Sequence, residues 1–252
     1  MQQGGKIARY LLCTVVAIVT FISSAPASYW QPIIKSVSHD AVRLVNANGS
    51  IWNGHGQLAL QIGVDRWQVF NEPIHWQIGF TLHGMRVIVD DQNHRLFVSP
   101  LGLWLTPLSV MVDAGRCEFP AQSLEVLGGI TRTVKLTGQI QLLWQSFSIQ
   151  KRGKLFITPV NYEIDANSVR SVISPLPQLG SYKITGSVSQ EGGVFKVSTL
   201  SGPLLISGQG ETGQHGIRFT GEAKAALGME DQLNGLLLLM GDISGGVAHL
   251  HY

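Results

Sequence analysis

The sequence predicts a mainly β fold: an antiparallel, curved multi-stranded sheet or sheets with two short helices, preceded by one N-terminal transmembrane helix. Apolar and polar residues alternate with a period of two along most of the chain, a pattern typical of strands with one buried and one solvated face. Turn-forming pairs such as Asn48-Gly49 and Gly192-Gly193 separate the alternating runs at short intervals, which favours antiparallel hairpins. An uncharged apolar run near the N-terminus predicts the transmembrane helix.

The composition is that of a folded protein with a substantial core. The chain has 252 residues, of which 44% are hydrophobic and only 13% are charged. Its 29 glycines and many serine, threonine and glutamine residues supply polarity in place of charge, which suits sheets with uncharged polar faces. The net charge is +2 and no basic stripe occurs, so we expect no nucleic-acid partner.

The N-terminal segment has the features of an export signal. An apolar run that begins at Tyr10 follows two cationic residues, and the small residues Ala25-Pro26-Ala27 come after it. Because cationic flanks stay in the cytoplasm, residues 1–9 are predicted to be cytoplasmic and residues 28–252 to form a β-rich domain across the membrane. We predict a retained transmembrane anchor over residues 10–27. The run is shorter than the roughly 20 residues that span a bilayer, so a cleaved signal peptide is the alternative.

The clearest strand is predicted over residues 134–144. Leu136, Ile140 and Trp144 lie on one face of the alternation, whereas the neighbouring Thr137 lies on the other. The same alternation predicts further strands over residues 58–62, 74–80, 195–199 and 217–223. One face of each strand is therefore expected to meet solvent.

Two short helices are predicted, over residues 120–127 and 229–240, each followed by a glycine that can cap its C-terminus. Each helix ends a strand-rich stretch. This order suggests two repeats of a meander followed by a helix, over residues 40–128 and 134–241. The repeat is faint in sequence, so a single undivided domain is an equal alternative.

No residue group meets the requirements of a catalytic, cofactor or metal site, so none is assigned. Nucleophile elbows, phosphate loops and dinucleotide-binding glycine motifs do not occur in the sequence. Glu163 and Asp165 would share one face of a strand, which leaves a paired-acid hydrolase as a weak hypothesis. Asp90-Asp91 is interpreted as part of a hairpin turn, and Cys117 as a small buried hydrophobe. We expect no enzymatic activity.

Several glycine-rich motifs follow one another along the chain. They are Gly49-Ser50-Ile51-Trp52-Asn53-Gly54, Leu179-Gly180-Ser181-Tyr182, Ser201-Gly202-Pro203-Leu204, Ser207-Gly208-Gln209-Gly210 and Phe219-Thr220-Gly221. In order and spacing they resemble the type II secretion system protein N family over nearly the whole chain. The signature residues, interpreted as structural, are Gly49, Trp52, Gly54, Gly180, Tyr182, Gly202, Pro203, Gly208, Gly210 and Gly221. We expect Gly49 and Gly54 to make room for a buried Trp52.

The resemblance implies a non-catalytic accessory component of the cell inner membrane that acts in protein secretion. Its single anchor would place the N-terminus in the cytoplasm and the β-rich domain in the periplasm. There it would be a structural or interaction partner of other type II secretion components in the export of folded proteins. The resemblance implies no cofactor and no small-molecule substrate. The alternating strands favour one alternative, a membrane-tethered lipid-binding or lipid-transfer protein with an apolar groove.

Overall fold

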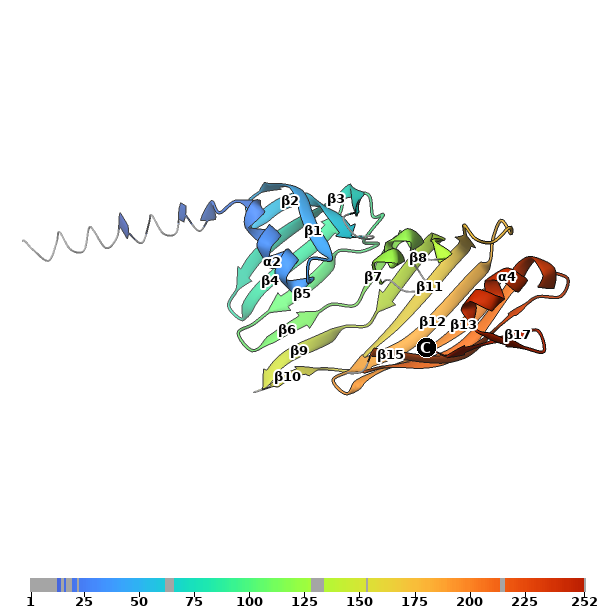
Figure 1. The fold of residues 1–252 in the computed structure, drawn as a ribbon. Coiled ribbons are helices and arrows are strands. Elements are labelled where there is room, and N and C mark those ends of the chain that lie inside the picture. The colour runs from blue at the N-terminus through green and yellow to red at the C-terminus, as the bar shows by residue number, and fades with distance from the viewer. Residues whose placement is uncertain are drawn as a thin grey trace, which may run out of the picture.

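Two antiparallel sheets make up the fold and lie side by side (Figure 1). The computed structural model describes residues 13–14, 16, 20–21, 23–61, 66–127, 134–152, 154–213 and 216–251. In spatial order, the first sheet consists of β1 (Val42–Gly49), β2 (Asn53–Gln61), β3 (Trp67–Thr81), β4 (Gly84–Asp91), β5 (Leu101–Leu105), β6 (Ser109–Val112), β9 (Phe147–Arg152) and β10 (Lys154–Ile157).

In the second sheet, as in the first, most neighbouring strands are consecutive in the chain. In spatial order it consists of β16 (Asp242–Ser244), β17 (Val247–His251), β15 (Gly216–Ala225), β14 (Leu204–Gly213), β13 (Gly192–Ser201), β12 (Gly180–Ser189), β11 (Val160–Ser171), β8 (Leu136–Trp144) and β7 (Gly115–Pro120). Every named pair of neighbouring strands is antiparallel. The predicted mainly β, antiparallel fold is therefore confirmed.

The chain passes between the two sheets at three places. Two residues separate β6 from β7, two separate β8 from β9, and two separate β10 from β11. One strand of each pair lies in the first sheet and the other in the second, and β6 pairs with β9 just as β7 pairs with β8. The sheets are thus continuous through these three consecutive crossings. The division into repeats at residues 128–134 stays a prediction.

Short helices accompany the two sheets. The predicted helix over residues 229–240 is α4 (Glu230–Met240), and the one over residues 120–127 is a 3-10 helix, η2 (Ala121–Leu127). The helix α2 (Trp30–Val37), which continues from the 3-10 turn η1 (Ala27–Tyr29), was not predicted. It begins three residues after the end of the predicted membrane segment, in a stretch that was assigned to the β-rich domain.

Of the residues 10–27 over which the membrane anchor is predicted, residues 10–12, 15, 17–19 and 22 lie outside the described part of the chain. Within the described residues, no helix is both long enough and apolar enough to cross a membrane.

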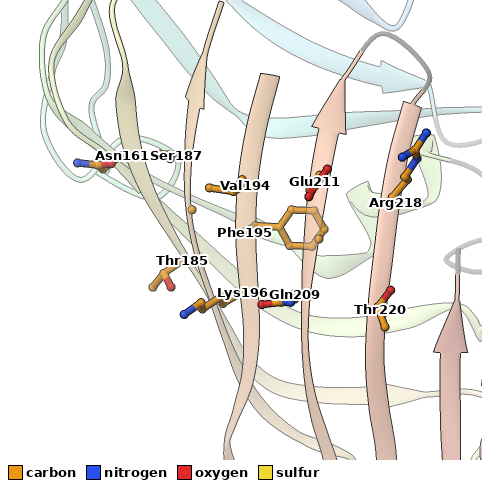
Figure 2. A pocket seen from close by; sticks show the side chains of 12 residues that line it. Asn161, Thr185, Ser187, Val194, Phe195, Lys196, Gln209, Glu211, Arg218 and Thr220 are labelled. Atoms are coloured by element: carbon orange, nitrogen blue, oxygen red, sulfur yellow. The ribbon is translucent and has the colours of Figure 1, made fainter. Parts of the chain in front are cut away.

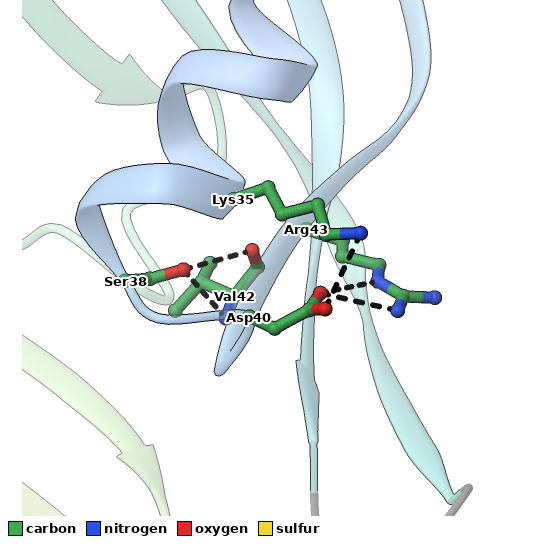
Figure 3. Close-up of polar contacts among 5 residues, drawn as sticks. All are labelled: Lys35, Ser38, Asp40, Val42 and Arg43. Carbon is green, nitrogen blue, oxygen red and sulfur yellow. Dashed lines mark hydrogen bonds and ion pairs between the residues drawn. The ribbon is translucent and has the colours of Figure 1, made fainter.

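A polar cluster fixes the turn from α2 into β1 (Figure 3). Asp40 accepts hydrogen bonds from the Arg43 guanidinium at 3.1 and 3.2 Å and forms an ion pair with Lys35 at 3.3 Å. The Ser38 hydroxyl accepts a hydrogen bond from the backbone N–H of Val42 at 3.1 Å. Desolvation acts to raise the pKa of Asp40, but hydrogen bonds from Arg43 and Lys35 outweigh it and lower the pKa. These exposed pairs orient the turn and contribute little to stability.

Each sheet has its own apolar core. The first core holds Trp76, Ile74 and Leu44 from the sheet, with Trp30 and Ile34 of α2 packed against it. The second core lies under α4 and is formed by Leu179, Leu204, Ala223, Leu233, Leu236, Leu237, Ala248 and Leu250, with Val134. The helix α4 approaches β15, β16 and β17, at one border of the second sheet. The rest of that sheet's apolar face has less cover.

Candidate functional site

The first signature motif forms the turn between β1 and β2. Gly49 has a φ of 89°, a left-handed conformation that favours glycine. The Ser50 hydroxyl oxygen accepts hydrogen bonds from the backbone N–H groups of Trp52 and Asn53, at 3.2 and 3.1 Å. A Cβ on Gly54 would lie 2.5 Å from the indole of Trp76 and 2.6 Å from a backbone oxygen. The glycine at position 54 therefore makes room for Trp76, and the expectation that it makes room for Trp52 is wrong.

This turn joins three parts of the fold. The Trp76 indole N–H donates to the carbonyl of Ser50 at 3.2 Å, and that of Trp30 donates to the carbonyl of Ile51 at 3.0 Å. The backbone N–H of Ile78 donates to the carbonyl of Trp52 at 2.6 Å. Trp52 itself is half-buried, and its ring centroid lies 5.1 Å from that of Phe80. The motif is a structural junction between α2, β2 and β3.

The second set of signature residues lies where β12, β13 and β14 meet. Gly180 and Gly202 approach so closely that a Cβ on Gly202 would lie only 2.3 Å from the Cα of Gly180. The buried Tyr182 donates its hydroxyl hydrogen to the carbonyl of Leu204 at 3.0 Å, and burial raises its pKa. The carbonyl of Pro203 accepts a hydrogen bond from Ala226 at 2.7 Å. These contacts hold the adjoining ends of β12, β13 and β14 together.

Gly208, Gly210 and Gly221 lie on that same apolar face, beside aromatic rings. The pairing register places Trp144, Tyr162, Gly186, Phe195, Gly210 and Phe219 in one row across six strands. A Cβ on Gly210 would meet the Phe195 ring, and a Cβ on Gly208 or Gly221 would meet the Phe219 ring. Phe195 and Phe219 are stacked, with ring centroids 5.9 Å apart and planes 5° from parallel. Glycine at these positions lets the rings lie flat on the sheet.

An apolar cavity of about 400 Å³ lies on this face, between η2 and α4. Its volume is within the roughly 300–1,000 Å³ typical of ligand pockets. The lining residues are apolar apart from the Tyr182 hydroxyl and the Met240 thioether; they are Phe119, Ala121, Leu124, Val134, Leu136, Ile140, Leu142, Ile164, Ala166, Val169, Leu179, Tyr182, Ile184, Val197, Leu204, Ile206, Leu236 and Met240. The cavity is the candidate functional site of the described chain.

The opposite face of the second sheet is polar. Glu163 and Asp165 of β11 both face Lys183 of β12, and the Asp165 Oδ1 to Lys183 Nζ distance is 3.3 Å. The hydrogen bond that Lys183 donates to Glu163 is the main cause that raises the lysine pKa, and the hydrogen bond to Asp165 is a smaller cause in the same direction. The two carboxylates are thus partners of one cation on a strand surface. This arrangement gives the paired-acid hydrolase hypothesis no support.

A hollow of about 520 Å³ also lies on this sheet (Figure 2). Thr185, Lys196, Gln209 and Thr220 stand on the neighbouring strands that form it. All four side chains are exposed, and its charged residues Lys196, Glu211 and Arg218 are exposed too. Solvent screens such exposed charges, so their electrostatic attraction for a ligand is weak. Within the described part of the chain, no group of three or more histidine, cysteine, aspartate or glutamate residues could hold a metal ion.

The Asp91 carboxylate is completely buried and has a structural role. It accepts backbone N–H bonds from Arg95 at 2.6 Å, Leu96 at 3.1 Å and Phe97 at 2.7 Å. The interpretation of Asp90-Asp91 as turn-forming is confirmed for Asp91, which holds the segment after β4.

Cys117 lies on the apolar face, in register with Leu142, and desolvation raises its thiol pKa to about 11. The thiolate is the reactive form, so a Cys13→Ser chain should react with iodoacetamide at pH 8 about 100-fold more slowly than an unperturbed cysteine of pKa 9.0. The rate should rise about tenfold per pH unit up to pH 10, and unfolding in urea should restore the ordinary rate. Fast alkylation of the folded chain at pH 8 would contradict this account of Cys117.

The structure defines a class of protein: two continuous antiparallel sheets, the second of which carries an apolar cavity. Its first sequence motif shapes the β1–β2 turn of the first sheet, and the later motifs shape the turns and the floor of the second. The family model of type II secretion system (T2SS) protein N matches residues 40–248. The chain belongs to this family and is a component of the type II secretion system. No significant match was found among curated proteins or among solved structures.

Sequence reasoning found residues that shape the site and gave an apolar groove as an alternative, but it did not locate the cavity. Of the signature residues, only Tyr182 lines it, while the glycines act from beneath or beside it. The lining comes from six strands and two helices, so no short motif contains it. The signal that was present is the alternation itself, which marks Leu142, Ile164, Ile184 and Val197 as apolar-face residues.

Proposed function

We propose that this protein is a non-catalytic accessory component of the type II secretion machinery, held at the inner membrane with its β-rich domain in the periplasm. The observation that carries the proposal is the family match over residues 40–248. The cationic residues before the N-terminal apolar run support the orientation with the N-terminus in the cytoplasm. In this role the protein contacts other inner-membrane and periplasmic components and carries out no reaction of its own.

Two of the edge strands, β1 and β16, are poorly suited to partner binding. β1 borders the first sheet and has an irregularity between Val45 and Asn48, with Asn46 at a φ of 53°. β16 borders the second sheet and is only three residues long. Short and irregular edges resist pairing with a further strand. Side chains on the surface are therefore the better candidates for contacts.

Exposed apolar residues gather at one end of the first sheet. The β3–β4 turn holds Leu82, and the β5–β6 turn holds Leu108, both exposed. Because Met85 of β4 pairs with Leu105 of β5, the two turns lie at the same end. Phe80 and Met111, also exposed, lie next to them. Exposed apolar patches commonly mark protein interaction sites, so we assign the contact with other secretion components to this surface.

Photo-crosslinking tests the proposal. A photoreactive amino acid at Leu82 or Leu108, in cells that express the secretion system, should yield crosslinks to other secretion components identified by mass spectrometry. The same amino acid at Thr185, exposed on the polar face of β12, is the matched control and should yield few. Recovery of no secretion component from either leucine position would contradict the proposal.

A second candidate function, lipid binding or transfer, is favoured by one specific observation, the apolar cavity between η2 and α4. A protein can hold a lipid while it serves the secretion assembly. The two functions use different surfaces and are tested separately.

A further inference from the structure

The apolar face of the second sheet is covered unevenly. In the first sheet, Trp30 and Ile34 of α2 pack on the core of buried strand residues. In the second sheet, α4 buries Leu204 and Ala223 at one border. Between the helices, the apolar row Leu142, Ile164, Ile184 and Val197 stays only half-buried, although the register places its members side by side on four neighbouring strands.

The cavity over this row offers an occupant nothing to hydrogen-bond. The hydroxyl of Tyr182 already donates to the carbonyl of Leu204 at 3.0 Å. The other lining residues carry no side-chain nitrogen or oxygen. A polar ligand would lose its hydrogen bonds to water without replacement, whereas an apolar ligand would lose none. The lining therefore selects a hydrocarbon.

The dimensions fit one lipid tail. The cavity floor runs across the neighbouring strands β7, β8, β11, β12, β13 and β14, which at strand spacings of about 4.8 Å extends about 24 Å, long enough for one tail. The tails of one lipid leaflet span about 15 Å, half of a bilayer core of about 30 Å. The volume of about 400 Å³ leaves room for a slender chain and no bulky headgroup.

Exposed apolar residues border the cavity at one end of the second sheet, the end at which β11 and β15 finish. Val172 follows the end of β11, and Leu227 follows the end of β15; both are exposed. These two strand ends lie together because the strands between them alternate in direction. Leu238 and Leu239 of α4 are also exposed, at 61% and 58%. A tail that leaves a bilayer here would meet apolar surface before it reaches the cavity.

We propose that the cavity between η2 and α4 binds a single acyl chain of a lipid, which enters past Val172, Leu227 and Leu239 and leaves its headgroup outside. The site is built from the second sheet alone and does not depend on the apolar turns of the first sheet. Its failure would therefore leave the proposed contact with secretion components untouched.

Photolabelling in vesicles tests the site. The full chain is reconstituted in vesicles of phosphatidylethanolamine and phosphatidylglycerol that contain either phosphatidylethanolamine with a diazirine at the end of its acyl chain or a free fatty acid with the same group. After illumination, mass spectrometry should locate labels on peptides of β8, β11, β12 and β13. Labelling by both probes identifies a phospholipid tail as an accepted ligand, and labelling by the fatty acid alone identifies the free acid.

Matched variants on opposite faces sharpen the test. Ala166→Trp places an indole in the cavity and should reduce labelling of these peptides about tenfold. Thr185→Trp adds the same group to the polar face and should leave labelling unchanged. Circular dichroism checks the fold of each, with Val197→Phe as a second cavity variant should Ala166→Trp fail to fold.

Two results would overturn the proposal. One is labelling of the wild-type chain confined to its N-terminal apolar run or spread over the polar face, which needs no variant to interpret. The other is a folded cavity variant that is labelled as strongly as the wild type.

Discussion

Replacing Trp76 with alanine is expected to lower the free energy of unfolding by about 3–5 kcal/mol, as truncation of large buried aromatic residues does. Trp76 is 7% exposed, fills the space beside Gly54, and donates its indole N–H to Ser50. The loss would be a large part of the roughly 5–15 kcal/mol that holds a domain together. Urea denaturation followed by tryptophan fluorescence or circular dichroism measures it.

Trp52→Ala is the matched comparison, because Trp52 belongs to the same motif but is only half-buried. Its effect should be clearly smaller than that of Trp76→Ala. A larger loss for Trp52→Ala would show that the signature tryptophan, and not Trp76, anchors this turn.

Leu233→Ala should be the most damaging single truncation in α4, at about 2–5 kcal/mol. Its side chain is completely buried in the second core, together with Leu236 and Leu237. Leu239→Ala, on the exposed side of the same helix, should change stability by less than about 0.5 kcal/mol. Thermal melts of both variants provide the measurement. Equal losses would mean that the two sides of α4 are packed alike, contrary to the structure.

The elements that the sequence predicted are those whose signal lies in neighbouring residues. The alternation over residues 134–144 needs no information from elsewhere in the chain, and it corresponds to β8. The glycine after Met240 likewise marked the end of α4. By contrast, α2 was not predicted. It has no side-chain N-cap hydrogen bond, and it follows the apolar run that was interpreted as a membrane segment. A helix stabilised mainly by the packing of Trp30 and Ile34 gives a weak local signal.

The contacts that were missed are those between strands. Gly54 meets Trp76 because the pairing of β2 with β3 places these two residues opposite each other. They are 22 positions apart in the sequence, which gave no indication of that pairing. Glu163 and Asp165 were noticed as a pair, but their partner Lys183 lies on the next strand and turns them into an ion-pair cluster. The cavity is the extreme case, because it exists only once six strands and two helices are assembled.

The three crossings between the sheets have a mechanical consequence. A linker between two domains bends at little cost, whereas here successive strands continue across the boundary and stay hydrogen-bonded to neighbours that do the same. Swinging one sheet against the other would break several backbone ladders at once. The two sheets thus form one stiff unit, with α2 on the first sheet and α4 on the second (Figure 1). Whatever binds near α4 is held at a fixed reach from whatever is bound near α2.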